Sequence, residues 1–382
     1  MSSAKKPTDI QSASMHRLAL EFARPAMVLA RDVYDEDGTI MVAAGSALTD
    51  RLITRLQNWE IKSVFVRNPR IELPPLPDAL LEKTRHQVRL MVAHTFNLIR
   101  RAEKFSMSDD EQQTVHSIVE AATQDPLSVV HIAHIDRNSR DILSHSVNIA
   151  LLSTATALSM GIKNSVHLNE LALSALLHDI GILMIPQDLT ARRWKLTAEE
   201  ALIYREHTNW GLTILRQSSF PPSVSLVAQE HHENADGSGY PNQLTRDFLH
   251  PFSRIVSAVN AYENLCAGSS DCKGCQASLA YESIMTGAGT RFDTKVAKAL
   301  RARLPMYPTG SMVELTNGLI GVVLSATPSL PHRPHLKILT DADESMLENP
   351  FSLDLADLEN QTIFVKNVLS DEKAARFLTN TP

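Results

Sequence analysis

The sequence has few cysteines, few aromatic residues and no long hydrophobic run. Only three cysteines occur in 382 residues, and aromatic residues make up 5% of the chain. No apolar segment approaches the roughly 20 residues that a membrane-spanning helix needs. The polar N-terminal segment MSSAKKPTDIQSAS lacks the apolar core of a secretory signal. These absences predict a cytoplasmic protein with no membrane span.

Positive charge is also scarce. The formal net charge is −6 at pH 7, whereas a general nucleic-acid binder normally presents a basic face. We therefore expect no nucleic-acid polymer among the partners. The hydrophobic content of 43% and the charged content of 21% are ordinary for globular proteins, and 382 residues suffice for two or three domains.

The three cysteines, Cys266, Cys272 and Cys275, all lie in one short stretch. Cys272 and Cys275 form a C-x-x-C pair, but the neighbouring sequence offers no obvious further ligands for a four-coordinate zinc site. One interpretation is a cytosolic loop with reduced thiols. The alternative is a redox-responsive or metal-capturing loop, and the sequence does not choose between them.

The first fifth of the chain predicts three short segments. Residues 1–17 are typical of a disordered leader. Residues 18–70 predict a small α+β module, because short apolar alternations flank the turn pair Asp37-Gly38 and an amphipathic stretch is followed by the strand-like Ser63-Val64-Phe65-Val66. The prolines of residues 71–77 then predict a stiff linker.

The remainder predicts a long helical region and a final β-rich module. Apolar residues recur with helical spacing in connecting helices over 78–126 and in an all-helical domain over 127–304. Residues 305–382 alternate as strands do around an Asn317-Gly318 turn. The predicted fold class is therefore mainly α, with an all-helical domain flanked by a small N-terminal α+β module and a small β-rich C-terminal module.

Local signals predict where some helices begin and end. Thr197 is placed to cap a single helix that runs through AEEALIYREHTNWGLTIL, and Gly161 stands where a helix should stop. The amphipathic helix over 80–105 suits pairing with a second copy in a homodimer. It equally suits packing on its own domain, the commoner fate of such helices.

Histidines and carboxylates gather within the helical region. His178 and Asp179 end an apolar helix, and consecutive helical side chains diverge by about 100°. They can therefore share one cation only at the helix end, where Gly181 lets the backbone turn away. The candidate ligands are His145, His178, Asp179, His207, His231 and His232. Each histidine alone is more often structural, but their placement near helix ends favours a metal site. Imidazole nitrogen with carboxylate oxygen suits iron, manganese, zinc or nickel better than calcium or magnesium.

Two motifs carry a family resemblance. His178-Asp179-Ile180-Gly181 resembles the HD-x-G signature of HD-superfamily phosphohydrolases. His231-His232-Glu233 followed by Asp236-Gly237-Ser238-Gly239-Tyr240-Pro241 resembles the HHE-x-x-DGSGYP motif of the HD-GYP group. The resemblance covers roughly Leu127 to Leu304 and implies a metal-dependent cyclic di-GMP phosphodiesterase that acts in bacterial second-messenger signalling.

The resemblance also implies a site of two or three divalent metals, with iron or manganese favoured. His145, His178 and Asp179 would hold one metal, and Asp179 would bridge to a second that is held by His207, His231 and His232. Such a cation pair neutralises a phosphodiester anion and lowers the pKa of bound water, which makes His178 and Asp179 the implied catalytic residues.

Further residues have two interpretations each. Asp141 lies one helical turn before His145 and is either a solvated helix residue or a ligand for a third metal. The loop formed by Asp236, Gly237, Gly239, Tyr240 and Pro241 is either a structural turn or, as the resemblance implies, the border of the substrate site and a contact surface for a signalling partner.

Three positions depart from the family pattern. Ile182 stands where the family has a lysine for substrate phosphate. Asn260 stands where an aspartate ligand is usual, and its amide brings no negative charge. Within the segment that should be basic, Gly268-Ser269-Ser270-Asp271-Cys272-Lys273, only Lys273 offers a phosphate contact.

These departures leave three functional hypotheses. The first is a cyclic di-GMP phosphodiesterase, of full or of reduced activity. The second is a catalytically inactive module that keeps the fold and binds nucleotide or a signalling partner. The third is a phosphohydrolase that acts on another nucleotide. Loss of phosphate-clamping cations can remove several kcal/mol of transition-state stabilisation without abolishing metal binding.

Overall fold

The computed structural model describes residues 15–34, 40–59, 61, 63–67, 79–101, 106–124, 142–267, 277–327 and 330–379. These residues form two compact units, one within residues 78–304 and the other made of the N-terminal and C-terminal parts. Several predicted features fall outside the described residues: the first part of the leader, the Asp37-Gly38 turn, the linker 71–77, Asp141, Cys272, Lys273 and Cys275.

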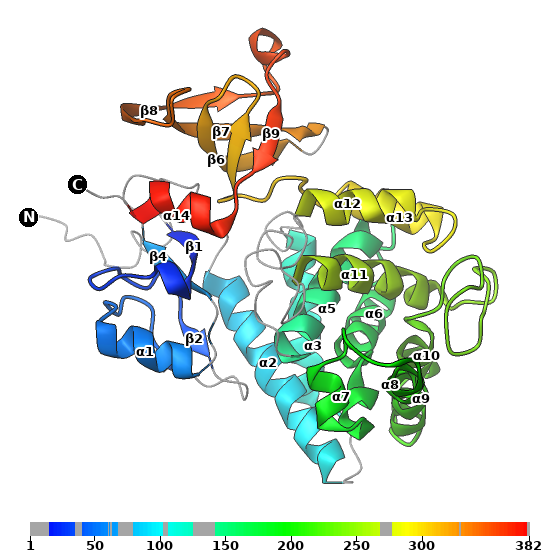
Figure 1. The fold of residues 1–382 in the computed structure, drawn as a ribbon. Coiled ribbons are helices and arrows are strands. Elements are labelled where there is room, and N and C mark those ends of the chain that lie inside the picture. The colour runs from blue at the N-terminus through cyan, green and yellow to red at the C-terminus, as the bar shows by residue number, and fades with distance from the viewer. Residues whose placement is uncertain are drawn as a thin grey trace, which may run out of the picture. The chain divides into compact units, whose positions relative to one another are not determined.

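In the described part of the unit of residues 78–304, the regular elements are all helices (Figure 1). Its longer helices are α2 (Ala79–Arg100), α3 (Asp109–Gln124), α5 (Ile142–Ser159), α6 (Ser165–Leu177), α9 (His207–Arg216), α10 (Pro222–Glu230), α11 (Pro251–Ala267) and α12 (Ala277–Thr286). The shorter helices are the 3-10 helix η3 (Ile180–Met184), α7 (Gln187–Ala191), α8 (Ala198–Arg205) and α13 (Thr294–Arg301).

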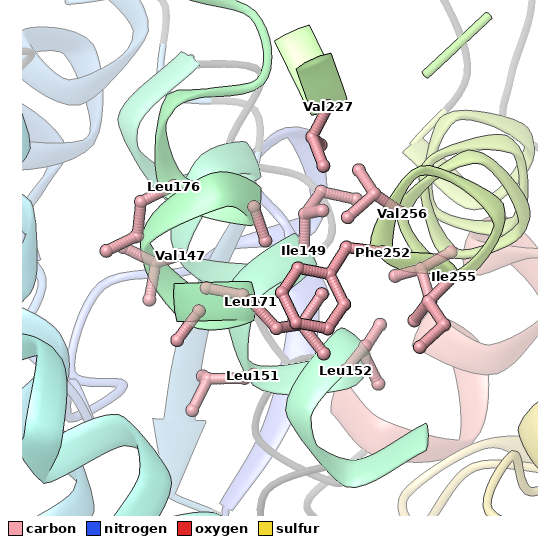
Figure 2. Packing of buried hydrophobic residues seen from close by; sticks show 14 of the residues in the cluster. Val147, Ile149, Leu151, Leu152, Leu171, Leu176, Val227, Phe252, Ile255 and Val256 are labelled. Carbon is pink, nitrogen blue, oxygen red and sulfur yellow. The ribbon is translucent and has the colours of Figure 1, made fainter. Parts of the chain in front are cut away.

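Helix α5 lies at the centre of this unit. It is long and apolar enough to cross a membrane by composition alone, yet 78% of it is buried inside the structure, as expected of a core helix. Figure 2 shows Val147 of α5 beside Leu171 and Leu176 of α6, with Phe252 and Ile255 of α11 on another side of the cluster. Full burial of such side chains contributes roughly 1.5–3 kcal/mol each, so this core fixes the helices that carry the histidines.

The predicted helix ends are mostly confirmed. Thr197 caps α8 in a reciprocal capping box with Glu200, and Gly161 adopts a left-handed φ of 83° just after α5. The prediction of one helix through AEEALIYREHTNWGLTIL is wrong. The chain forms α8 and α9 with a break at Glu206, whose N–H bonds back to the carbonyl of Ile203 in a tight turn.

In the other unit, the N-terminal module pairs β1 (Met15–Ala19) antiparallel with β4 (Ser63–Arg67), and β2 (Val33–Tyr34) with β3 (Ile40–Val42). Helix α1 (Asp50–Asn58) completes it and is capped by Thr49. Strand β1 thus begins within the predicted leader of residues 1–17. Leu18, Leu29 and Leu56 form its core together with Ala375 of the C-terminal helix α14 (Asp371–Thr379).

The C-terminal module is built on a five-stranded antiparallel sheet of order β8-β7-β6-β5-β9. Its strands are β5 (Met312–Leu315), β6 (Ile320–Thr327), β7 (Leu330–Thr340), β8 (Met346–Asp354) and β9 (Val365–Val368). The Asn317-Gly318 turn joins β5 to β6, with a left-handed φ of 87° at Gly318. The predicted fold class is confirmed, although helix α14 was not predicted.

Candidate metal centre

Four imidazole nitrogens surround the carboxylate of Asp179. The Oδ1 atom lies 3.2 Å from His231 Nε2 and 3.5 Å from His207 Nε2. The Oδ2 atom lies 3.4 Å from His178 Nε2 and 3.9 Å from His145 Nε2. Each carboxylate oxygen therefore faces its own pair of histidines.

His232 completes one of these two groups. Asp179, His207, His231 and His232 offer ligand atoms that all lie within 4.8 Å of one another, and His145, His178 and Asp179 do the same. All six side chains predicted from the sequence are thus brought together, with Asp179 in both groups. Their donor types fit divalent metal ions.

Backbone carbonyls orient three of the rings. His178 Nδ1 donates to the carbonyl of Ala175 at 2.8 Å, His207 Nδ1 to that of Tyr204 at 2.6 Å, and His231 Nδ1 to that of Ala228 at 3.0 Å. A carbonyl oxygen can only accept, so the proton of each neutral ring lies on Nδ1. The Nε2 lone pairs are consequently available toward Asp179, the arrangement that metal-binding histidines require.

Close backbone packing places His207. A Cβ built on Gly181 would lie 1.9 Å from the carbonyl oxygen of His207 and 2.5 Å from the amide nitrogen of Gly211. Gly181 is therefore needed because η3 packs directly against α9. The sequence predicts that Gly181 lets the chain leave helix α6, and its φ is not left-handed. Its missing side chain instead lets His207 approach the His178-Asp179 pair.

The centre is buried and partly without hydrogen bonds. His178 is fully buried and Asp179 is 9% exposed. Among the described residues, no hydrogen bond satisfies His178 Nε2 or Asp179 Oδ1. A buried polar atom without a partner costs on the order of 1–3 kcal/mol, and a cation bound between these atoms would satisfy both. The donor set and the unsatisfied atoms thus fit a metal site.

Burial also sets the protonation states. Burial lowers the pKa of His231 to about 4. Burial also lowers the pKa of His232 well below its ordinary value, and the neighbouring imidazoles of His231 and His207 lower it further. These rings are neutral near pH 7, as metal ligands must be. Burial tends to raise the pKa of Asp179, but attraction to the imidazoles of His178 and His231 in their protonated forms outweighs it and holds that pKa well below the ordinary value.

Glu233 holds the loop that follows His232. Its buried carboxylate accepts the N–H groups of Asn242 at 2.6 Å and Leu244 at 3.1 Å. A Cβ on Gly239 would lie 2.4 Å from the Glu233 Cα, so only glycine allows this approach. Gly237 adopts a left-handed φ of 81°. Gly237 and Gly239 are therefore required by the backbone conformation of this loop, independently of any contact with substrate.

Tyr240 joins this loop to the histidines. Its ring stacks on His232 with centroids 4.7 Å apart and planes 16° from parallel. The guanidinium of Arg205 lies 4.8 Å from the centroid of the Tyr240 ring. Arg205 is itself exposed. Within the motif, Asp236 is tied down locally, because it accepts from the N–H and the hydroxyl of Ser238, and Pro241 follows Tyr240 across a cis peptide bond.

Sequence reasoning missed Arg205 and Glu263. Arg205 sits at the end of α8 with no motif around it. Glu263 Oε2 lies 2.6 Å from His145 Nδ1, a contact across 118 residues. The predicted ligand Asn260 is buried in the same helix, and its amide oxygen accepts from Asn264 at 2.6 Å. The sequence gave one indication that Glu263 lies near the site, which is its position one helical turn after the candidate ligand Asn260.

Comparisons with known proteins agree with this geometry. Residues 129–296 match the family model described as "HD domain", and residues 312–377 match "KOW domain associated with HD domain". In the fold comparison, the HDG"Y"P protein Bd1817 from Bdellovibrio bacteriovorus superposes with a TM-score of 0.51 over 75% of this chain and 98% of that one, at 16% identity. Residues 129–296 are therefore an HD domain.

Two curated relatives define the group further. The chain is 28% identical to the cyclic di-GMP phosphodiesterase PdeB of Borreliella burgdorferi over 60% of either chain. It is 27% identical to the cyclic di-GMP phosphodiesterase PA4108 of Pseudomonas aeruginosa, over 70% of this chain and 66% of that one. The matched part is thus less than two thirds of the length of each relative. Over these shares the chain is similar to proteins named cyclic di-GMP phosphodiesterases, and residues 129–296 of it match the HD domain.

Proposed function

We propose that this protein is a metal-dependent phosphodiesterase that opens a cyclic dinucleotide, with cyclic di-GMP as the first candidate substrate. One observation carries the proposal: the two oxygens of Asp179 face two separate sets of imidazole nitrogens. A shared carboxylate between two ligand sets is what a pair of adjacent cations requires. The names of the relatives PdeB and PA4108 support the substrate.

In this proposal His145, His178 and Asp179 hold one metal, and Asp179, His207, His231 and His232 hold the second. Bound cations would neutralise the phosphodiester and make water a stronger nucleophile. The ligand chemistry favours iron or manganese, with zinc and nickel as further candidates. A third metal would need Asp141, which lies outside the described residues.

The protein itself contributes orientation and charge. The carbonyls of Ala175, Tyr204 and Ala228 hold three imidazole Nδ1 protons, so the rings need no reorganisation before ligation. Asp179 stays anionic beside its imidazole neighbours, which offsets part of the cationic charge. Preorganised groups of this kind are the main source of electrostatic catalysis.

Substrate phosphate needs a cation that the usual positions do not supply. Ile182 replaces the family lysine, and Lys273 lies outside the described residues. Arg205 is exposed beside Tyr240, which stacks on the cluster histidine His232. We therefore include Arg205 as a phosphate contact, with Tyr240 and the adjoining glycines as the border of the substrate site.

The second candidate is a non-catalytic module that binds nucleotide or a signalling protein through residues 236–241. Ile182 and Asn260 favour it, since both remove charge from the site. A cytoplasmic location and homodimer formation through α2 remain predictions from the sequence.

The test is turnover by protein that is purified without oxygen and analysed for metal. With iron or manganese bound, the wild-type chain should convert cyclic di-GMP to the linear dinucleotide, as followed by liquid chromatography. His178→Ala should stop the reaction, while His167→Ala, which changes an exposed histidine on α6, should not. Full metal occupancy with nucleotide binding but no product in any metal would favour the non-catalytic module.

A further inference from the structure

His145 differs from the other oriented histidines of the centre in what holds its ring. The Nδ1 atoms of His178, His207 and His231 are bonded to carbonyls one turn earlier in the chain. His145 Nδ1 instead lies 2.6 Å from Oε2 of Glu263, on helix α11. Its orientation therefore depends on a side chain from another helix.

Glu263 contacts helix α5 twice. Besides His145, it accepts a hydrogen bond from Asn148 Nδ2 through Oε1 at 3.2 Å, one turn further along α5. The Glu263 side chain is only 3% exposed. A buried carboxylate with two defined contacts has little freedom to rotate, so the ring that it holds is fixed as well.

The charge of Glu263 matters because Asn260 has none. Asn260 and Glu263 lie three residues apart on α11 and so share a face. Asn260 Oδ1 is already bonded to Asn264 Nδ2. A carboxylate that accepts the Nδ1 proton of a metal-binding histidine makes Nε2 a stronger donor and fixes its tautomer. Negative charge thus reaches the centre through the His145 ring.

We propose that Glu263 is a positioning residue of the metal centre, which fixes the Nδ1–H tautomer of His145 and compensates for the absence of a carboxylate at Asn260. The inference rests on the proposed function but goes beyond it. It makes binding of the metal that His145 would hold depend on the contact between His145 on α5 and Glu263 on α11. Glu263 touches neither substrate nor metal in this account and acts only through His145.

The experiment is a titration of metal-free full-length protein with Mn²⁺, with free Mn²⁺ measured by electron paramagnetic resonance. Glu263→Gln should weaken one of the two bound ions about 10-fold or more, the range found when such supporting carboxylates are removed. Glu230→Gln is the matched control, because Glu230 is also buried but accepts the backbone N–H of His250 rather than a proton from a histidine ring. It should leave both affinities unchanged.

A second variant separates positioning from folding. Asn260→Asp in the Glu263→Gln background should restore much of the lost affinity by returning a carboxylate to the site. Thermal unfolding of the metal-free proteins is measured in parallel. Equal Mn²⁺ affinity in Glu263→Gln and wild type would overturn the inference while leaving the proposed function intact. The same holds if Glu263→Gln lowers the thermal stability but leaves the Mn²⁺ affinity unchanged. A wild-type chain that binds no metal would overturn both.

Discussion

His16 is deeply buried, as are His178, His207 and His231 around Asp179. They lie in different units and have different surroundings. His16, on strand β1, is 4% exposed, and neither of its ring nitrogens finds a hydrogen-bond partner among the described residues. In the helical unit, Nδ1 of three rings is bonded to a carbonyl while Nε2 faces a shared carboxylate.

The comparison shows that burial alone does not indicate a metal-binding imidazole. Burial lowers the pKa of His16 to about 4, as it does for His231. What distinguishes the cluster is one anchored nitrogen on each of these rings and the convergence of the others on Asp179. A lone buried histidine is a cost to stability, whereas the cluster recovers that cost when a cation binds.

The largest effect is expected from removing the carboxylate at the centre of the cluster. Asp179→Asn should lower turnover on the order of 1000-fold, since several kcal/mol of charge stabilisation depend on the bound cations. Metal content and product formation measure it. Asp188→Asn, at an exposed carboxylate that pairs with Arg192, is the control. An Asp179→Asn protein with normal metal content and turnover would show that the cluster does not depend on the Asp179 carboxylate to bind metal.

The next effect concerns the contact that places His207. Gly181→Ala should destabilise the chain by about 3 kcal/mol, because a Cβ there would lie 1.9 Å from the His207 carbonyl oxygen. Gly161→Ala introduces a methyl group with nothing within 4 Å and should cost only about 1 kcal/mol from its left-handed φ. Urea denaturation compares the two, and equal losses would argue against the steric role of Gly181.

The pH dependence of the free energy of unfolding tests the cost of burying His16. The folded-state pKa of His16 is about 4, below its unfolded value of about 6.5. The unfolded chain therefore binds the proton more readily, and the stability that neutral His16 contributes is lost as the pH falls from 6.5 toward 4. Between pH 7 and pH 5 the loss is about 2 kcal/mol.

His16→Leu removes this titration. Its free energy of unfolding should fall about 2 kcal/mol less than that of the wild type over the same pH interval. Denaturation curves at pH 7 and pH 5, on metal-free protein, give the difference directly. Parallel curves for the two proteins would show that His16 is not responsible.

The smallest effect separates substrate binding from metal binding. Arg205→Ala should raise KM for cyclic di-GMP about fivefold, equivalent to about 1 kcal/mol, and leave metal content unchanged. Arg216→Ala, an exposed arginine at the end of α9, should change neither. If Arg205→Ala alters metal content instead, Arg205 supports the cluster rather than the substrate.

Much of the site could be predicted because its residues form contiguous motifs. His178-Asp179 and His231-His232 are adjacent in sequence, and each pair stands at a helix end that the apolar pattern reveals. Glu263 could not be found in this way, because its partner His145 is 118 residues distant. The break at Glu206 was also missed, since the apolar spacing continues across it.

The helical character of the central region, the strands of the C-terminal module and the residue types at the centre could all be predicted from the sequence. These follow from local periodicity, from turn residues such as Gly318, and from side chains with fixed chemistry. Three features emerge only from the folded structure: which oxygen of Asp179 faces which histidines, why position 181 excludes a side chain, and which carboxylate supports His145. Those outcomes depend on how α5 packs against α11 and how α9 packs against η3, and packing joins residues that no local pattern relates.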